Sequence, residues 1–171
     1  MRLLVFGIIS VILSVQSCGD DRPTPPPVNE AELREQLIDY NRNKMLVEDS
    51  LITSYLSEHA LSYEKTPTGL RYAVNSSEVG DSLSKGDVVR VAMEIWLLDS
   101  TLCYARNEDD PFSFILGESD APPGLHEMAG LLKKGDSAES IWPARLGYGL
   151  TGDQGRIPQD AILLVDLTML P

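Results

Sequence analysis

The residues with the strongest claim to a function lie in a glycine-rich stretch between two apolar segments. Residues 141–158 run from Ile-Trp-Pro to Arg-Ile-Pro and carry glycine at positions 147, 149, 152 and 155. Tyr148 stands among these glycines, and Ile157-Pro158 closes the stretch. Glycine is common where backbone adopts positive φ or closely approaches another group. Long loops inside compact domains tend to be functional, so the pattern favours a binding loop with an exposed Tyr148. A surface loop without a role is the alternative.

The sequence does not indicate a metal site, a cofactor, a catalytic triad or nucleic-acid binding. The two cysteines, Cys18 and Cys103, and the two histidines, His59 and His126, form no metal-ligand pattern, so we predict no metal site. The sequence contains no phosphate-binding glycine motif, Ser-His-Asp arrangement or dinucleotide fingerprint, and we predict no cofactor. A net charge of −12 disfavours a nucleic-acid partner, because no basic patch is present to meet phosphates.

Residues 65–171 are expected to form the globular domain that positions this loop. Apolar residues alternate as in strands that turn one face to a core. The expected strands are 69–74, 89–97, 101–105, 112–116, 138–142 and 161–170. Residues 124–132 have apolar residues at helical spacing, and Lys133-Lys134-Gly135 provides a helix end. Several antiparallel strands and one short helix predict an α+β domain in which the sheet covers the helix.

The N-terminal residues indicate export. Residues 1–17 have the charge and the short apolar run of a secretory signal peptide, too short to span a membrane. Val15-Gln16-Ser17-Cys18 resembles a bacterial lipobox, in which Cys18 is lipidated and becomes the mature N-terminus. An ordinary signal peptide followed by a chance cysteine is the alternative. With lipid on Cys18, Cys103 is expected to be a free, buried thiol.

Between this start and the domain lie a spacer and a helical arm. Residues 18–29 are rich in proline, which predicts an extended, semi-rigid linker. Residues 30–64 contain neither glycine nor proline, follow a plausible N-cap at Asn29, and are assigned to the arm. Its apolar stripe thins over 41–44, where we expect a bend or break. We expect the helix to end through Pro67 and Gly69.

A small domain cannot bury the stripe along the full length of this arm. The stripe consists of Leu33, Leu37, Tyr40, Val47, Leu51 and Tyr55. Two arrangements are therefore open. The arm either pairs with a second copy to form a homodimer or folds back and docks on its own domain.

Several motifs in order resemble the FKBP-type peptidyl-prolyl cis-trans isomerases. They are Gly-Leu-Arg-Tyr at 69–72, Gly-Asp-Val-Val at 86–89, Pro-Phe-Ser-Phe-Ile-Leu-Gly at 111–117, Gly-Leu-His-Glu-Met at 124–128, Lys-Gly-Asp-Ser-Ala at 134–138 and the loop. The resemblance implies an antiparallel sheet wrapped on one short α-helix. It also implies isomerisation of prolyl bonds in polypeptide substrates, with no covalent chemistry.

With the lipobox, the chain is similar to lipid-anchored isomerases of gram-negative envelopes, including the gliding-motility-associated kind. That similarity implies an outer-membrane protein, facing the periplasm or the cell surface, that assists folding of envelope or secreted proteins. A catalytically weakened chaperone or assembly module that binds polypeptide is the alternative.

The resemblance also assigns site residues. It implies that Phe112 lines the proline pocket, that the Tyr148 hydroxyl bonds a substrate carbonyl and that Ile157 packs on the ligand. These three are the expected catalytic residues. The expected substrate-binding residues are Met93, Cys103, Tyr104, Ala121, Pro122, Leu125 and Val165.

Five of these residues depart from the family pattern. Leu125 replaces a tryptophan, Val165 a phenylalanine and Met93 a tyrosine. Cys103-Tyr104 replaces a Phe-Asp pair, so the usual carboxylate beside the substrate is missing, and Asp99 and Asp109 are acids nearby in sequence. These changes widen the pocket and favour reduced activity.

Overall fold

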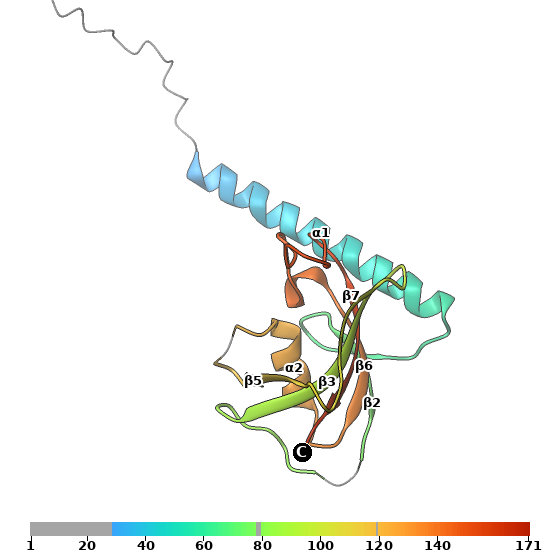
Figure 1. Cartoon of the computed structure of the whole chain (residues 1–171). Coiled ribbons are helices and arrows are strands. Elements are labelled where there is room, and N and C mark those ends of the chain that lie inside the picture. The colour runs from blue at the N-terminus through green and yellow to red at the C-terminus, as the bar shows by residue number, and fades with distance from the viewer. Residues whose placement is uncertain (1–28, 78–79, 119) are drawn as a thin grey trace, which may run out of the picture.

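The computed structural model describes residues 29–77, 80–118 and 120–171 (Figure 1). It contains a long helix, a seven-stranded sheet and a short helix against one face of the sheet. The elements are α1 (Glu30–Glu58), β1 (Glu64–Lys65), β2 (Arg71–Asn75), β3 (Val88–Leu97), β4 (Leu102–Arg106), β5 (Phe112–Ile115), α2 (Pro123–Leu131), β6 (Ser137–Trp142), the 3-10 turn η1 (Ala144–Leu146) and β7 (Leu163–Met169). The predicted α+β class, an antiparallel sheet with one short helix behind a long N-terminal helix, is confirmed.

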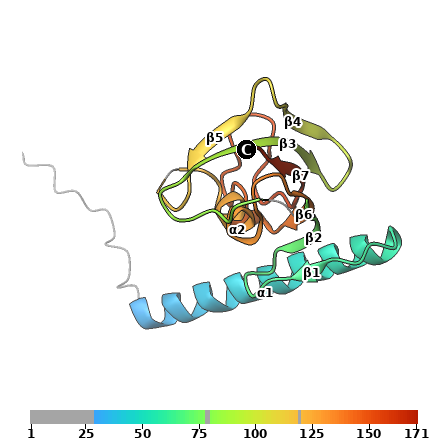
Figure 2. The ribbon, with the colours of Figure 1, turned by 90° about the horizontal axis from the view of Figure 1, so that it is seen from below.

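The sheet has the order β1-β2-β6-β7-β3-β4, and β5 also pairs with β3. All pairs are antiparallel. The central strands β7 and β3 alternate buried and more exposed residues, because successive side chains of a strand point to opposite faces. The buried face meets α2, which lies across it in Figure 2.

Helix α2 packs unusually close to the sheet. A Cβ atom on Gly124 would lie 2.6 Å from Cδ2 of Trp142, a contact that no side chain could make. Trp142 is fully buried, and its indole Nε1 donates to Ser140 Oγ at 2.9 Å. A glycine in the first turn of α2 therefore lets the helix rest directly on the indole ring.

Helix α1 ends earlier than the sequence suggested. It runs without a break through 41–44 and stops at Glu58, rather than continuing to Pro67. The reason is local: Ala60 adopts a left-handed φ of 54°, and the amide of Leu61 bonds back to the Leu56 carbonyl at 2.9 Å. Glu64 is then drawn into β1, where it pairs with Tyr72.

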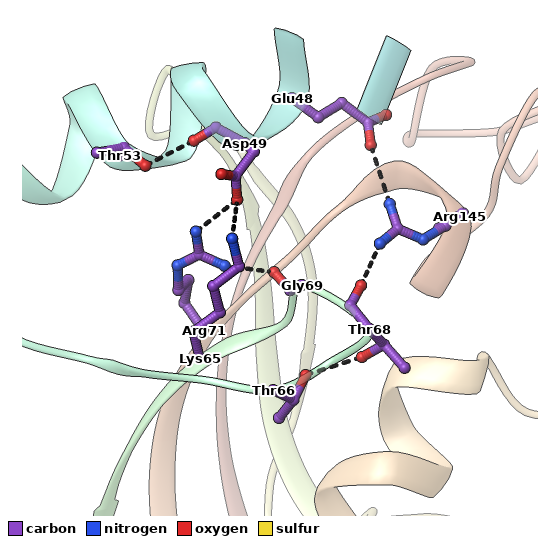
Figure 3. A network of polar contacts seen from close by, with 9 residues as sticks. All are labelled: Glu48, Asp49, Thr53, Lys65, Thr66, Thr68, Gly69, Arg71 and Arg145. Carbon is purple, nitrogen blue, oxygen red and sulfur yellow. Dashed lines mark hydrogen bonds and ion pairs between the residues drawn. The ribbon is translucent and has the colours of Figure 1, made fainter. Parts of the chain in front are cut away.

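The second half of α1 docks on the domain, and the first half extends past it (Figures 1 and 2). Ile52 is fully buried with Ile141 and Ile162. Close by, the Asp49 carboxylate accepts hydrogen bonds from Arg71 at 2.5 Å and Lys65 at 2.8 Å (Figure 3). In the part of the chain that the structure describes, no helix is long and apolar enough to cross a membrane.

Candidate functional site

Nine of the ten predicted catalytic and substrate-binding residues belong to the main core cluster of the domain or pack against it. Five are buried in this cluster, namely Met93, Cys103, Leu125, Ile157 and Val165. Four are partly buried and pack against that cluster, namely Tyr104, Phe112, Ala121 and Tyr148. The tenth, Pro122, caps the start of α2. We call the five buried side chains the apolar floor and the four partly buried ones, three of which are aromatic, the rim.

Tyr148 is less exposed than the sequence suggested. Its glycine neighbours predicted an open position, but the ring lies partly buried against the core. Burial, followed by the nearby Asp153, Tyr104 and Cys103, raises the pKa of Tyr148, so the hydroxyl stays protonated at neutral pH. Within the described residues no hydrogen bond to this hydroxyl is found, which leaves it available as a donor.

An acid that the sequence analysis did not select holds the tip of the loop. The Asp153 carboxylate accepts hydrogen bonds from the Gly155 and Ile157 amides, both at 2.8 Å, and from the Tyr104 hydroxyl on β4. Arg156 lies 5.5 Å from the centre of the Tyr104 ring and donates to the Cys103 carbonyl at 2.9 Å. The loop is therefore attached to β4 beside the apolar floor.

This attachment keeps Asp153 ionised. Loss of water around the carboxylate opposes ionisation, but the hydrogen bonds from Tyr104, Ile157 and Gly155 outweigh it and lower the pKa to about 2. Cys103 behaves in the opposite way: burial, and then the charges of Asp153 and Asp99, raise the pKa of its thiol. Cys103 is a buried free thiol, as predicted, and is unsuited to nucleophilic chemistry.

The carboxylate beside the site thus comes from the loop and not from β4. Asp99 accepts the Thr101 amide at 3.0 Å within its own turn, and Asp109 lies in an exposed loop. The signal for Asp153 was present in Asp-Gln-Gly, since aspartate commonly accepts a hydrogen bond from the amide two residues on. Among residues 29–77, 80–118 and 120–171, no group of three or more His, Cys, Asp or Glu side chains is arranged to hold a metal ion.

The family assignment comes from the sequence of this region. The profile described as FKBP-type peptidyl-prolyl cis-trans isomerase matches residues 79–170, which is more than half of the chain. The chain belongs to this isomerase family. The match spans β3 to β7 and includes every residue that the sequence analysis placed at the floor or rim of the site.

Individual FKBP relatives agree with this assignment. A probable FKBP-type peptidyl-prolyl cis-trans isomerase, FkpA of Neisseria meningitidis serogroup B, is 30% identical over 120 residues, covering 68% of this chain and 43% of that protein. Peptidyl-prolyl cis-trans isomerase FKBP15-2 of Arabidopsis thaliana is 32% identical over 105 residues, covering 60% of this chain and 62% of that protein. The chain spans less than half the length of the Neisseria relative.

Solved structures show the same FKBP fold. FkpA from Escherichia coli superposes with a TM-score of 0.63 at 23% identity, over 84% of this chain and 73% of that one. AtFKBP13 gives a TM-score of 0.59 at 20% identity, over 64% of this chain and 98% of that one.

Tyr104→Phe tests the attachment of the loop. Loss of the hydroxyl donor is expected to raise the pKa of Asp153 from about 2 towards the ordinary aspartate value. Asp153 stabilises the fold above its unfolded pKa of about 3.9 and loses this effect as pH falls through its folded pKa, so the variant should lose stability chiefly above pH 4. At pH 7 the variant should unfold at a lower urea concentration than wild type, and this difference should shrink as the pH falls below 4.

Carboxyl NMR titration checks the pKa directly. Tyr72→Phe is the matched control, because it removes another tyrosine–carboxylate hydrogen bond, to Glu64 at 2.8 Å, far from the loop. An Asp153 titration curve that is identical in wild type and Tyr104→Phe would contradict the interpretation.

Proposed function

We propose that this protein is a peptidyl-prolyl cis-trans isomerase that acts on proline-containing polypeptides. Family membership supports the reaction class, and the free hydroxyl of Tyr148 above an apolar floor is the observation that carries the proposal. The substrate proline ring packs against Phe112 and Ile157, and Tyr148 donates to a carbonyl of the flanking peptide.

The reaction suits a site without a titrating acid or base at its centre. Rotation about a peptide bond meets a barrier of roughly 18–20 kcal/mol, because it breaks the resonance of the amide. The cis and trans forms of a prolyl bond are close in energy but exchange over tens to hundreds of seconds. The twisted amide has less charge separation than the planar one, so apolar surroundings favour it over the ground state. A positioned hydrogen bond holds the flanking chain while the bond rotates.

The second candidate is a binding module that keeps the fold but has lost most catalysis. It is favoured by Leu125 and Val165, which take the places of a family tryptophan and phenylalanine and are buried in the core cluster. Aliphatic side chains at these positions supply no aromatic walls to a proline ring. Such a protein would hold unfolded polypeptide as a chaperone or assembly factor.

An isomerisation assay with a short Xaa-Pro peptide separates the two candidates. We expect the protein to accelerate cis-to-trans relaxation, and Tyr148→Phe to reduce kcat/KM roughly 2- to 12-fold, as the loss of one hydrogen bond implies. Phe112→Ala should reduce it roughly tenfold or more, because apolar contact with the proline ring is lost. Tyr40→Phe, on the exposed face of α1, is the control and should match wild type. If the protein binds the peptide but does not accelerate its isomerisation, the isomerase proposal is refuted and the binding module is supported.

We also propose that the protein is a lipoprotein of a gram-negative envelope, with the gliding-motility-associated lipoproteins as its nearest functional kind. Under this proposal residues 1–17 are the signal peptide, Cys18 carries lipid, residues 18–29 space the molecule from an outer membrane, the arm covers 30–64 and the isomerase domain 65–171. Residues 1–28 lie outside the described residues, so the proposal rests on the lipobox pattern.

Replacement of Cys18 tests the anchor. In a gram-negative host, the mature protein is expected to carry acyl mass by mass spectrometry and to sediment with membranes. Cys18→Ser should lose both properties because the thioether to lipid cannot form. Cys103→Ser, which removes the other cysteine, should retain both. Wild-type protein without acyl mass would refute the anchor.

We propose in addition that two copies associate through α1. Its stripe of Leu33, Leu37, Tyr40 and Val47 remains exposed although the second half of the helix is docked. Several large apolar side chains exposed along one face of a helix favour an interaction site. A second copy of the same helix offers a matching stripe, in the self-complementary manner of a two-fold interface.

Sedimentation of charged variants tests the association. Leu37 is 53% exposed within the stripe, and Leu46 is 62% exposed on the opposite side of the helix. Leu37→Glu is expected to convert a dimer to monomer by placing a charge in the interface, whereas Leu46→Glu should remain dimeric. A wild-type protein that stays monomeric at all accessible concentrations would exclude this interface.

A further inference from the structure

Helix α1 touches both ends of the loop that carries Tyr148 and Ile157. We define residues 143–160 as the site loop. Near its start, Arg145 Nη1 lies 3.6 Å from Oε2 of Glu48 on the helix (Figure 3). At its end, the Asp160 carboxylate pairs with Lys44, one helical turn earlier. The helix supplies Lys44 and Glu48, and the loop supplies Asp160 and Arg145. The two ion pairs therefore join one face of the helix to both ends of the loop.

These contacts are partly shielded from water. The Glu48 side chain is only 9% exposed and that of Lys44 is 23% exposed. Burial raises the pKa of Glu48, while the charges of Lys44 and Arg145 act against this rise. Removing one partner from a shielded pair costs more than removing one from an exposed pair, because the other charge stays poorly solvated. Arg145 also donates to the Thr68 carbonyl, which fixes the guanidinium between helix and domain (Figure 3).

Backbone hydrogen bonds carry this attachment to the residues around Tyr148. The Ala144 carbonyl, beside Arg145, accepts the Gly147 amide at 3.0 Å and the Gly149 amide at 2.8 Å. The Asp160 amide donates to the Gly149 carbonyl at 2.9 Å. The backbone on both sides of Tyr148 is therefore bonded to the two segments that α1 contacts. Met45 of the helix and Leu150 of the loop also border one small hollow between them.

We infer that α1 is a positioning element of the site, in which Lys44 and Glu48 set the conformation of the site loop and thereby the affinity for the peptide substrate. The inference rests on the proposed function for its substrate, but the attachment itself is a property of the free protein. Lys44 and Glu48 are positioning residues, since neither reaches the apolar floor. The helical arm is thus coupled to substrate binding.

Three substitutions of the purified full chain test this. Lys44→Gln removes the charge that pairs with Asp160, and Glu48→Gln removes the charge that pairs with Arg145. Lys44→Arg keeps the positive charge and should retain the ion pair with Asp160 and the wild-type behaviour. Lys65→Gln is the matched control, because Lys65 also ties α1 to the domain, through Asp49 at 2.8 Å, but its ion pair involves no residue of the site loop.

Hydrogen exchange measures the attachment without assuming any activity. The amides of Gly147, Gly149 and Asp160 should exchange roughly two- to fivefold faster in Lys44→Gln and roughly tenfold faster in Glu48→Gln, with β3 and β7 unchanged. Lys44→Arg and Lys65→Gln should match wild type. The inference would be overturned if these three amides exchanged at the wild-type rate in both Lys44→Gln and Glu48→Gln. It would also be overturned if Lys65→Gln accelerated their exchange as much as those two variants do.

Peptide kinetics then test the consequence for the site. Tyr148 is expected to hold the substrate equally in the ground and transition states. Lys44→Gln should therefore raise KM roughly two- to fivefold and Glu48→Gln roughly tenfold, and both should leave kcat unchanged. Should wild type not accelerate isomerisation, the proposed function fails while the exchange result still decides the inference, and peptide Kd replaces KM. Unchanged KM or Kd despite faster exchange would overturn the coupling to substrate.

Discussion

The connection between β6 and β7 has no strand partner, and its internal hydrogen bonding is the constraint on which the site depends. Backbone amides and carbonyls withdrawn from water need partners, and this segment finds them mostly within itself. The Asp153 amide bonds the Ile157 carbonyl at 3.1 Å, and the Asp153 carboxylate accepts two amides further on. Gly152 has φ +64°, and a Cβ there would lie 2.3 Å from the Ile157 oxygen. A side chain at that position would open the turn that places Ile157 in the core.

Helix α1 joins the domain through charges as well as through apolar contact. Its buried apolar contribution is centred on Ile52, while Lys44, Glu48 and Asp49 each meet a partner on the domain. Most helical stability in proteins comes from packing of an apolar face, and among the described residues Leu33, Leu37 and Tyr40 in the first half of α1 remain exposed. The helix is consequently anchored at one end, beside the site loop, and unsupported at the other.

The chemistry of the site fits this construction. Isomerisation of a prolyl bond moves no proton, so the site has to provide an apolar surface, a hydrogen-bond donor and a fixed geometry. The charged groups nearby, Asp153 and Arg156, are engaged with Tyr104 and with the backbone. They hold the rim of the site in place, and the floor beneath it consists of buried apolar side chains.

The sequence by itself determined the class of fold and the family, and through the family resemblance it predicted the site residues. Alternating apolar residues identified the strands, the spacing of Leu125, Met128 and Ala129 identified α2, and the order of the motifs identified the family. These features are local, because periodicity records which face of an element is buried. Only the tertiary structure decided which distant side chains meet. Tyr104 and Asp153 are 49 positions apart, and Lys44 and Asp160 are 116 apart. Lys44 lies where the apolar stripe thins and predicted a bend or break, yet it makes one of the two ion pairs that attach an unbroken helix to the loop. No local pattern encodes such pairs, since they exist only once the sheet, the loop and the helix have been brought together.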